Sequence, residues 1–420
     1  MFHLLTVLLL VTLGYENAAA ESSVDTNADD NGHGHIVIEV DPVLTLREVV
    51  LRTVEREPGR EVVVARREEA AELQNNATRL LAGAPLIEAF YVSDDLSTND
   101  GYRQWDVALE FPLWWPGQRS GRRLSARAAG SAASHAERAH ALQVAGWVRQ
   151  AVAELALARV RLELTEAEWR AEDELASQIE RAVALEELAE RDLLLARSAS
   201  LDRKLLYLEA LEESGHSEGS YSLLTGFSSW PGDWSEILAD PESFENHPLL
   251  LLAKDEAARA QGELDRLTAD QWGHPRLAVG TQHEREESGA NFDDRIVAGV
   301  RIPLGRRSDA QAKIAGARRA LAEARRDHRR LERELRERLT KAEHRYSLAS
   351  ERVSTAAEQA EMAAEYLRLT ERGFGLGESD LGNLLRARSR STAAQQTHRE
   401  ALILKQSSTS EMNQALGVVP

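Results

Sequence analysis

Two histidines near the N-terminus are the residues whose type and spacing most suggest metal chemistry. His33 and His35 stand two residues apart in the segment Asn-Gly-His-Gly-His, and imidazole is the commonest metal ligand among side chains. The surrounding segment is rich in aspartate and glycine and precedes the part of the chain that is expected to fold. We therefore favour a flexible spacer here, with weak metal binding by His33 and His35 as the alternative.

The rest of the chain offers little for catalysis. Its 420 residues include no cysteine and only three methionines, which excludes disulfides, thiolate metal sites, a lipidated N-terminal cysteine and a methionine relay for copper or silver. No Ser-His-Asp set, His-Glu-x-x-His motif or phosphate-binding glycine pattern falls on suitable elements. His283 and Glu284 lie in an expected surface loop. The sequence therefore predicts no enzyme, no cofactor and no resident metal, and its function must rest on architecture.

Prolines and glycines that recur at a nearly constant interval reveal how the chain is organised. The interval is 190 or 191 residues and is held across most of the chain, which is typical of two copies of one structural unit. We expect these repeats over 44–235 and 236–420. The matched pairs are Pro58 with Pro248, Pro85 with Pro275, Pro112 with Pro303, and Gly226 with Gly417.

Each copy contains a long proline-free stretch dense in alanine, leucine, glutamate and arginine, which favour helices. The stretches 120–182 and 308–372 predict helices of roughly 95–100 Å at about 1.5 Å per residue. Apolar residues recur in sevens, as in Val148, Leu155 and Leu162, which predicts coiled-coil packing. A plain antiparallel coiled coil fits this periodicity equally well. The shorter helices are expected at 188–214, 248–272 and 379–415.

Proline-flanked segments before the long helices show the alternation of β-hairpins. In the hairpin expected at about 85–113, Trp105, Val107 and Leu109 alternate with Asp106 and Ala108. The second hairpin is expected at about 276–303. Strands of about ten residues are long enough for a tilted crossing of a membrane.

The N-terminus and the charge indicate where the chain works. An apolar stretch followed by a small-residue cleavage site predicts a signal peptide at 1–20 and export, with the flexible segment extending over 21–43. No other stretch approaches the roughly 20 apolar residues of a transmembrane helix. The net charge of −18 disfavours nucleic acid as a partner.

Four strands in one chain cannot close a barrel and would leave two open edges. Three chains would supply twelve strands, which is enough for closure. We therefore expect a mainly α-helical fold with a small β part, assembled as a homotrimer.

Several motifs, taken together and in order, resemble the TolC-type outer membrane efflux family over roughly 44–417. The segment 111–119 (Phe-Pro-Leu-Trp-Trp-Pro-Gly-Gln-Arg) and the residues 223–226 are similar to its heavy-metal (cobalt–zinc–cadmium) branch. The other segments that carry the resemblance are 188–196, 246–248, 274–277, 299–304, 375–381 and 384–387.

This resemblance implies a passive exit duct in the outer membrane of a Gram-negative bacterium. A trimeric transmembrane β-barrel would continue into a long α-helical barrel across the periplasm. Its partners would be outer membrane lipid, a periplasmic adaptor protein and an inner-membrane efflux pump. The cargo would be chosen by the pump, and heavy-metal cations are one candidate.

The turn at 372–380 is the most informative candidate site. Gly373, Gly375 and Gly377 are expected to end the long helix, and Ser379 is expected to cap the next one. The resemblance implies adaptor contact by Gly375, Gly377, Glu378 and Ser379. The matching turn near 185–191 has no glycine and is expected to be tighter.

Two aspartates lie close to these turns. In a trimer, Asp380 and Asp192 would each form a ring of three carboxylates that repel one another and could serve as a gate. Solvated carboxylates at helix starts are the favoured alternative. A soluble periplasmic adaptor or scaffold is the main rival to the duct, although such a protein needs only one helical hairpin.

Overall fold

The computed structural model describes residues 38–97, 100–305 and 307–420. The expected signal peptide at 1–20 and the histidines His33 and His35 therefore lie outside the described residues. Within the described part, helices predominate and strands are few, as the sequence predicts.

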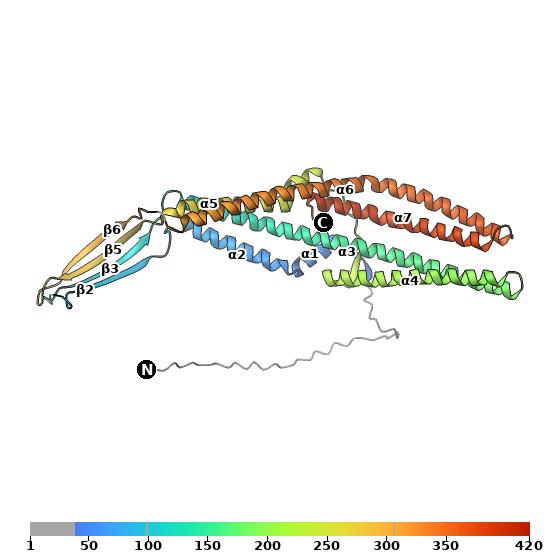
Figure 1. Ribbon diagram of the computed structural model, residues 1–420, viewed down its shortest axis with the longest axis horizontal. Helices are drawn as coiled ribbons and strands as arrows, with labels where there is room; N and C mark the ends of the chain where they lie inside the picture. The colour runs from blue at the N-terminus through green and yellow to red at the C-terminus, as the bar shows by residue number, and fades with distance from the viewer. Residues whose placement is uncertain (1–37, 98–99, 306) are drawn as a thin grey trace, which may run out of the picture. The chain divides into compact units, whose positions relative to one another are not determined.

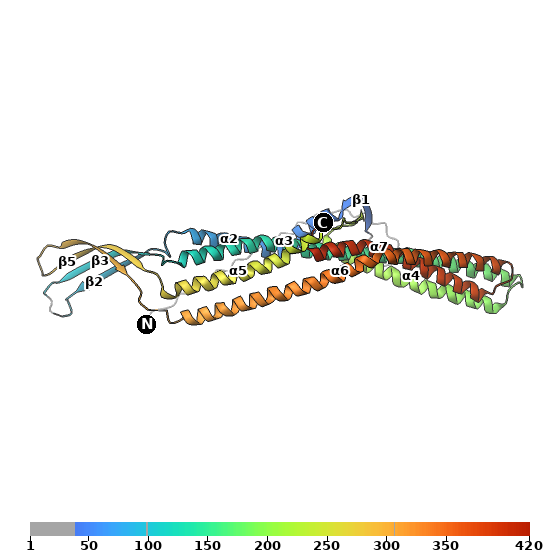
Figure 2. The same ribbon diagram turned by 90° about the horizontal axis from the view of Figure 1, so that it is seen from above.

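Two very long helices and two shorter ones form a pair of helical hairpins. Helix α3 (Gln118–Ala184, 67 residues) packs against α4 (Glu190–Thr225), and α6 (Ala310–Gly375, 66 residues) packs against α7 (Leu381–Leu416). Figures 1 and 2 show α4 and α7 beside the parts of α3 and α6 that lie farther from the strands. Each long helix is continuous, in agreement with the expected helices at 120–182 and 308–372. None of the described helices is both long and apolar enough to span a membrane.

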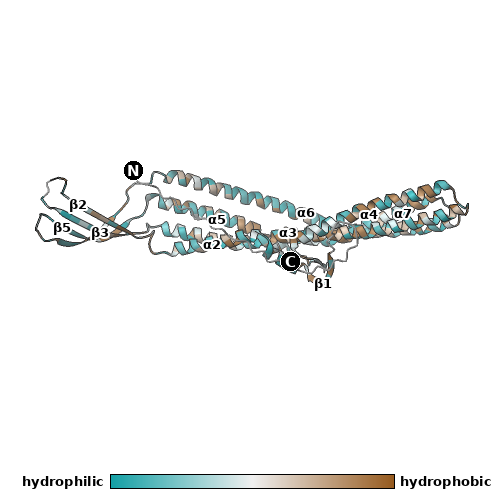
Figure 3. Cartoon of the chain, turned by 90° about the horizontal axis from the view of Figure 1, so that it is seen from below, coloured by the Kyte–Doolittle hydropathy of each residue, from teal (hydrophilic) through white to brown (hydrophobic). Residues whose placement is uncertain are grey.

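Small residues repeated at seven-residue intervals explain how α6 packs so closely. One buried line of this helix carries alanine at four of its five positions, and alanine lets helix backbones approach one another. The line is Leu335, Ala342, Ala349, Ala356 and Ala363. Figure 3 shows hydrophilic and hydrophobic residues mixed along every helix.

The remaining helices flank the first part of α3. They are α1 (Leu46–Arg56), α2 (Gly59–Thr78) and α5 (Pro248–Ala269), followed by the 3-10 turn η2 (Asp270–Trp272). Helix α3 contacts both α2 and α5, and α5 also contacts α6. A further 3-10 turn, η1 (Pro241–Asn246), precedes α5.

The strands of both expected hairpins join in one antiparallel sheet with the order β2-β3-β5-β6. These strands are β2 (Leu86–Ser93), β3 (Arg103–Pro112), β5 (Arg276–Arg285) and β6 (Asp293–Arg301). Along β3, Val107 pairs with Ala89 and Thr281, and Leu109 pairs with Ile87 and Val279. One face of the sheet is therefore apolar. Strands β2 and β6 are its outer strands (Figure 1).

The opposite face of the same sheet is polar and crosslinked by charge. Glu110 is buried and lies 3.0 Å from Arg276 and 2.9 Å from Arg301. Arg301 also lies 3.5 Å from Glu88 on β2. These ion pairs join all four strands near the ends of β3 and β6, so the alternation in the sequence corresponds to two chemically distinct faces.

A second, two-stranded sheet corrects the expected flexible segment at 21–43. Strand β1 (Glu39–Thr45) pairs in parallel with β4 (Ser229–Asp233), and Ile38 is buried beside it. Residues 39–43 therefore belong to the folded part. The prediction failed because the partner of Glu39 is Ser229, 190 residues away, so local composition carries no sign of the pairing.

The return helix expected at 188–214 is also corrected, since α4 continues to Thr225. The continuation contains Gly215 and Gly219, and glycine in a helix costs about 1 kcal/mol relative to alanine. Tertiary burial of Ser214 and Tyr221 outweighs that cost. The helix ends instead at Gly226, which adopts the left-handed conformation at φ 75°. Gly417, its counterpart at the end of α7, does the same at φ 83°.

The largest apolar core joins residues from both halves of the chain. Val144, Val148 and Leu155 of α3 lie at its centre, and Ile403 and Val419 pack against it from the second half. A buried ion pair lies nearby, in which Arg149 binds both carboxylate oxygens of Glu236 at 2.6 and 2.8 Å. Residues of the second half of the chain thus contribute to the packing of this core.

Candidate docking site at the helical turns

The ends of the two helical hairpins are short turns of equal length. Residues 185–189 connect α3 to α4, and residues 376–380 connect α6 to α7. Figures 1 and 2 show the turns at the ends of the paired helices. These turns contain the candidate residues that the sequence suggests.

Backbone hydrogen bonds are the same in both turns. Glu187 N–H donates to Ala182 O at 2.9 Å, and Glu378 N–H donates to Gly373 O at 2.8 Å. Glu186 and Gly377 both adopt left-handed backbones, at φ 61° and 76°. This pattern is a Schellman motif, which satisfies the last carbonyls of a helix. The expectation that the first turn is tighter is wrong, because Glu186 accepts the conformation that glycine adopts in the second turn.

Capping differs from the expectation in two details. Gly373 and Gly375 lie within α6, and Gly377 alone of the three has positive φ. The cap of α7 is Asp380, whose carboxylate accepts a hydrogen bond from Asn383 N–H at 2.7 Å, and not Ser379. A carboxylate also interacts favourably with the positive end of the helix dipole, which makes Asp380 the better cap.

Exposed leucines are a feature of this site that the sequence reasoning missed. Leu185 and Leu376 are the equivalent residues of the two turns, and they are 70% and 65% exposed. The interval of 191 residues that relates Gly226 to Gly417 also relates these leucines and could have identified them. The two turns also carry four acidic residues and no basic one, namely Glu186, Glu187, Glu378 and Asp380.

A small apolar core lies beneath both turns and holds the hairpins together. Leu175 and Ile179 of α3 and Leu381 and Leu384 of α7 are buried in it, with Ala196 from α4. Partly buried residues of all four helices pack against this core. The structure therefore brings the two turns into one region supported by common packing.

The two candidate gate residues occupy different positions in their helices. Asp380 is the cap of α7, and its carboxylate is bound to Asn383. Asp192 lies in the first turn of α4 with its carboxylate 3.7 Å from Arg191. Neither geometry by itself indicates a gate.

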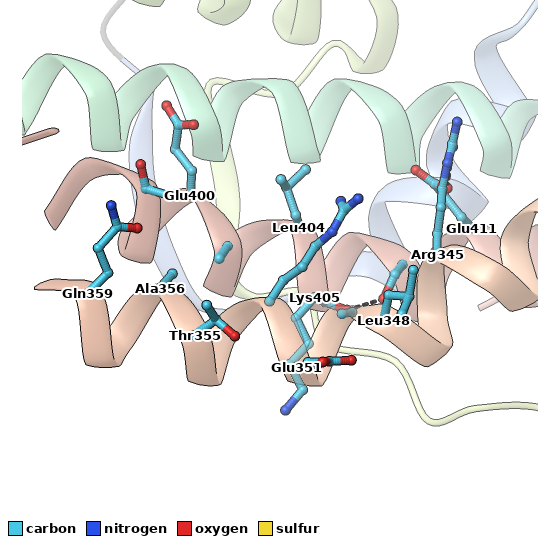
Figure 4. A pocket seen from close by; sticks show the side chains of 15 residues that line it. Arg345, Leu348, Glu351, Thr355, Ala356, Gln359, Glu400, Leu404, Lys405 and Glu411 are labelled. Carbon is cyan, nitrogen blue, oxygen red and sulfur yellow. Dashed lines mark hydrogen bonds and ion pairs between the residues drawn. The ribbon is translucent and has the colours of Figure 1, made fainter. Parts of the chain in front are cut away.

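Elsewhere, the described residues hold no grouping of histidine and carboxylate side chains suited to a metal ion. A groove of about 770 Å³ lies between α6 and α7, with Ala349, Ala356 and Leu404 on its walls (Figure 4). Its charged rim includes Arg345, which is paired with Glu411 at 2.8 Å. Polar side chains, among them Thr355, Gln359 and Thr397, also line the groove.

Comparison with known proteins identifies solved structures of similar fold. No family model and no curated protein matches the sequence. Solved structures do match: the outer membrane protein VceC from Vibrio cholerae has a TM-score of 0.73 at 14% identity over 89% of this chain and 96% of its own. The CmeC outer membrane channel of Campylobacter jejuni has a TM-score of 0.71 at 12% identity, over 89% of this chain and 85% of its own.

The structure of CusC, described in terms of transmembrane channel formation, is similar to the same degree. Its TM-score is 0.71 at 13% identity, over 93% of this chain and 96% of its own. With identities this low, the likeness concerns the fold. The paired helical hairpins, the four-stranded sheet and these matches together show that the chain has the fold of the TolC-type outer membrane channels.

Proposed function

We propose that the chain is the outer membrane exit duct of a tripartite efflux system in a Gram-negative bacterium. It conducts passively what an inner-membrane pump exports through a periplasmic adaptor. The observation that carries the proposal is a four-stranded sheet with one apolar face and two open edges, joined to helical hairpins that end in matched exposed turns. Neither part suits a catalytic pocket, so we assign no enzymatic activity.

The two faces of the sheet support insertion into a membrane. Trp105, Val107 and Leu109 are substantially exposed on the apolar face, where water would be an unfavourable neighbour. Asp106 and Glu110 lie on the other face. Apolar-out and polar-in alternation is typical of transmembrane barrels. We therefore expect the apolar face to contact lipid and the polar face to line the lumen.

The open edges of the sheet and two exposed stripes on the helices support a homotrimer. Three copies would close twelve strands into a barrel, which removes the unpaired edges of β2 and β6. In the helical part, α4 exposes Leu194, Leu201, Leu205 and Leu208, and α6 exposes Met362, Tyr366 and Leu369. Both stripes lie within about five turns of their hairpin ends. Mutual covering of α4 of one copy by α6 of the next would complete an α-helical barrel.

The exposed turns suit docking of the adaptor. We assign Gly375, Gly377, Glu378 and Ser379 to this contact and add Leu376, with Leu185 at the equivalent place in the first turn. An apolar side chain surrounded by carboxylates would complement a partner that offers an apolar pocket and basic residues. Rings of Asp192 and Asp380 in the trimer remain candidates for the gate.

The repeat and the cargo complete the proposal. We attribute the like order of elements in 44–235 and 236–420 to an internal duplication. The heavy-metal branch, with divalent cations as cargo, rests on the resemblance of the segment 111–119, and CusC matches the fold no better than the other channels. A periplasmic adaptor or scaffold is the alternative, but it would leave the apolar face of the sheet without a role.

The test is a complementation experiment in a strain that lacks the gene. Gly377→Val combined with Leu376→Asp should leave the amount of outer membrane trimer unchanged and abolish resistance to the cargo of the pump. Gly316→Ala, within α6, outside the assigned contact and with open space around it, is the matched control and should retain resistance. Full resistance of the double variant would place docking elsewhere, and loss of trimer would make the turn a structural element only. A chain that washes free of membranes would favour the scaffold.

A further inference from the structure

Two glutamates of α3 face both neighbouring helices in the part of the hairpins beyond the main core. Glu168 and Glu172 are one helical turn apart. The Glu168 carboxylate lies 3.4 Å from the Arg203 guanidinium of α4. Arg388 of α7 donates a hydrogen bond to Ala171 O of α3 at 3.2 Å, next to Glu172. The two glutamates therefore stand where both hairpins meet.

The charges in this cluster are incompletely satisfied. Glu172 is only 5% exposed, and its Oε2 atom is buried without a hydrogen-bond partner. Arg388 does not supply one, because it binds Glu371 of α6 at 3.2 Å and its own Nε is unpartnered. A buried carboxylate with an unmatched oxygen is costly when ionised and much less so when protonated.

The direction of the pKa shifts agrees with this geometry. Burial raises the pKa of Glu172 above its ordinary value, and the attraction of Arg388 and Arg203 only partly opposes it. Burial also raises the pKa of Glu168, against the attraction of Arg203 and a hydrogen bond with Thr392 of α7. The proton is thus held more tightly by these carboxyls in the packed arrangement than in water.

A cavity connects the cluster to both hairpins. It measures about 280 Å³ and lies against Glu168 and Arg203, with residues of α3, α4 and α7 on its walls. This volume is large enough for water molecules, each of which takes about 30 Å³ in the liquid. Protons and water can therefore approach Glu168 without unfolding of the helices.

The other charged groups around the two glutamates have partners of their own. Asp173 accepts a hydrogen bond from Ser200 at 3.0 Å, and Lys204 of α4 lies over the Trp169 ring at 5.2 Å. Nearer the N-terminus of α3, two ion pairs join this helix to α7: Arg161 pairs with Glu400, and Glu163 pairs with Arg399. The side chains of these two ion pairs are accessible to solvent. Glu172 differs from them because its carboxylate is buried and has an oxygen without a hydrogen-bond partner.

We propose that Glu168 and Glu172 form a proton-controlled joint between the α3–α4 hairpin and the α6–α7 hairpin. Protonation stabilises the packed arrangement, and loss of the protons favours an arrangement in which the hairpins separate and water reaches the carboxylates. The joint lies within one chain, so it does not rest on the proposed assembly. It would make the spacing of the two helical turns depend on the pH of the medium.

The sign of the effect follows from linkage. A carboxyl whose pKa is raised by folding contributes stability that is complete below the ordinary carboxyl pKa and is lost as the pH rises through the raised value. Acid conditions therefore tighten the joint, which loosens as the pH rises through the raised pKa. Glu172→Gln reproduces the neutral form at every pH and should keep the joint tight.

Thermal unfolding of the full chain tests the energetic part. At neutral pH, Glu172→Gln should unfold about 2 °C above the wild-type chain, and this difference should vanish as the pH falls below the ordinary carboxyl pKa. Glu174→Gln, two residues along α3 on an exposed position, is the matched control and should show no pH-dependent difference. A Glu172→Gln chain that is less stable than wild type at neutral pH would overturn the proposal, as would a difference independent of pH.

Spin-label distances test the motion, and the absence of native cysteine makes the labelling specific. Labels at Leu185→Cys and Leu376→Cys report on the spacing of the two turns by double electron–electron resonance. The distance distribution should broaden toward longer values as the pH rises, and it should stay narrow in the background of Glu172→Gln. Glu168→Gln provides a second comparison and should narrow the distance distribution in the same direction. If the distance between the two labels does not change with pH in the wild-type background, the proposed joint is refuted.

Discussion

The two helical turns show that a backbone geometry can be imposed on different residues. Glu186 and Gly377 take the same left-handed conformation, although a side chain in that region costs roughly 1–2 kcal/mol. Hydrogen bonds to the ends of α3 and the packing beneath the turn hold Glu186 in place. The first turn therefore contains strain that the second turn avoids.

Substitution of the two residues should reveal this strain. Glu186→Gly should raise the free energy of unfolding by about 1 kcal/mol, and Gly377→Val should lower it by about 1–2 kcal/mol. A Cβ atom added at Gly377 would meet no other residue within 4 Å, so the cost comes from the positive φ of the backbone and not from a clash. Denaturant unfolding of purified chains measures both. Equal effects of valine at Gly377 and at the helical Gly375 would contradict a conformational cause.

The buried pair of Arg149 and Glu236 gives a pH dependence of the opposite sign to that of Glu172. Burial alone would raise the pKa of Glu236, but hydrogen bonds and attraction from Arg149 outweigh it and lower the pKa. The stability that this pair contributes is therefore present above the ordinary carboxyl pKa and is lost as the pH falls through the lowered value.

Removing one partner should be costly, because it leaves the other charge buried. We expect Glu236→Gln to reduce the free energy of unfolding by about 3 kcal/mol at neutral pH. The deficit should shrink under strongly acidic conditions, and unfolding curves collected across the pH range measure it. A deficit that grows on acidification would show that the pair is not ionised in the folded chain.

At the scale of elements, the sheet separates two kinds of surface by alternation along each strand. Val107 has Ala89 and Thr281 as its lateral neighbours on the apolar face, whereas Asp106 lies between Phe90 and Gln282 on the other face. Because the side-chain period of a strand is two residues, adjacent positions on β3 should differ in their tolerance of charge.

Charge scanning tests which face meets lipid. Val107→Arg should cost roughly 2–4 kcal/mol near the bilayer midplane and reduce insertion into the outer membrane. Val300→Arg on β6 should behave in the same way. Asp106→Lys is the neighbouring control and should insert at the normal level. Equal tolerance of charge at Val107, Val300 and Asp106 would mean that these strands do not face lipid.

At the scale of the whole molecule, the single chain leaves several surfaces uncovered. The outer strands β2 and β6 have one open edge each, and the apolar stripes of α4 and α6 are exposed. Hydrophobic repeats between parallel or antiparallel helices become stable when both stripes are covered. The proposed assembly of three copies would cover the edges of the sheet and the stripes of the helices together.

Disruption of one stripe should separate assembly from folding. Leu201→Asp combined with Leu205→Asp should convert cross-linked trimers to monomers and leave the helical content of the chain unchanged. Ile237→Asp, at a residue that is 93% exposed and lies outside both stripes, is the control and should remain trimeric. Normal trimers of the double variant would show that the stripe of α4 does not contact another copy.

Much of the architecture follows from the sequence by itself, because periodic signals are local. The interval between Pro112 and Pro303, the long proline-free helices and the alternation along 105–111 predicted the order, type and approximate length of the main elements. The candidate turn at 372–380 was found in the same way, since glycine and a capping side chain mark helix ends.

Only the tertiary structure decided the features that join distant residues. The pairing of Glu39 with Ser229 depends on a partner that no local window contains. The same holds for Glu172, which in the sequence is one of many helical glutamates. Its buried and unmatched carboxylate exists because α4 and α7 close over that turn of α3, and burial is a property of the packed chain rather than of any segment.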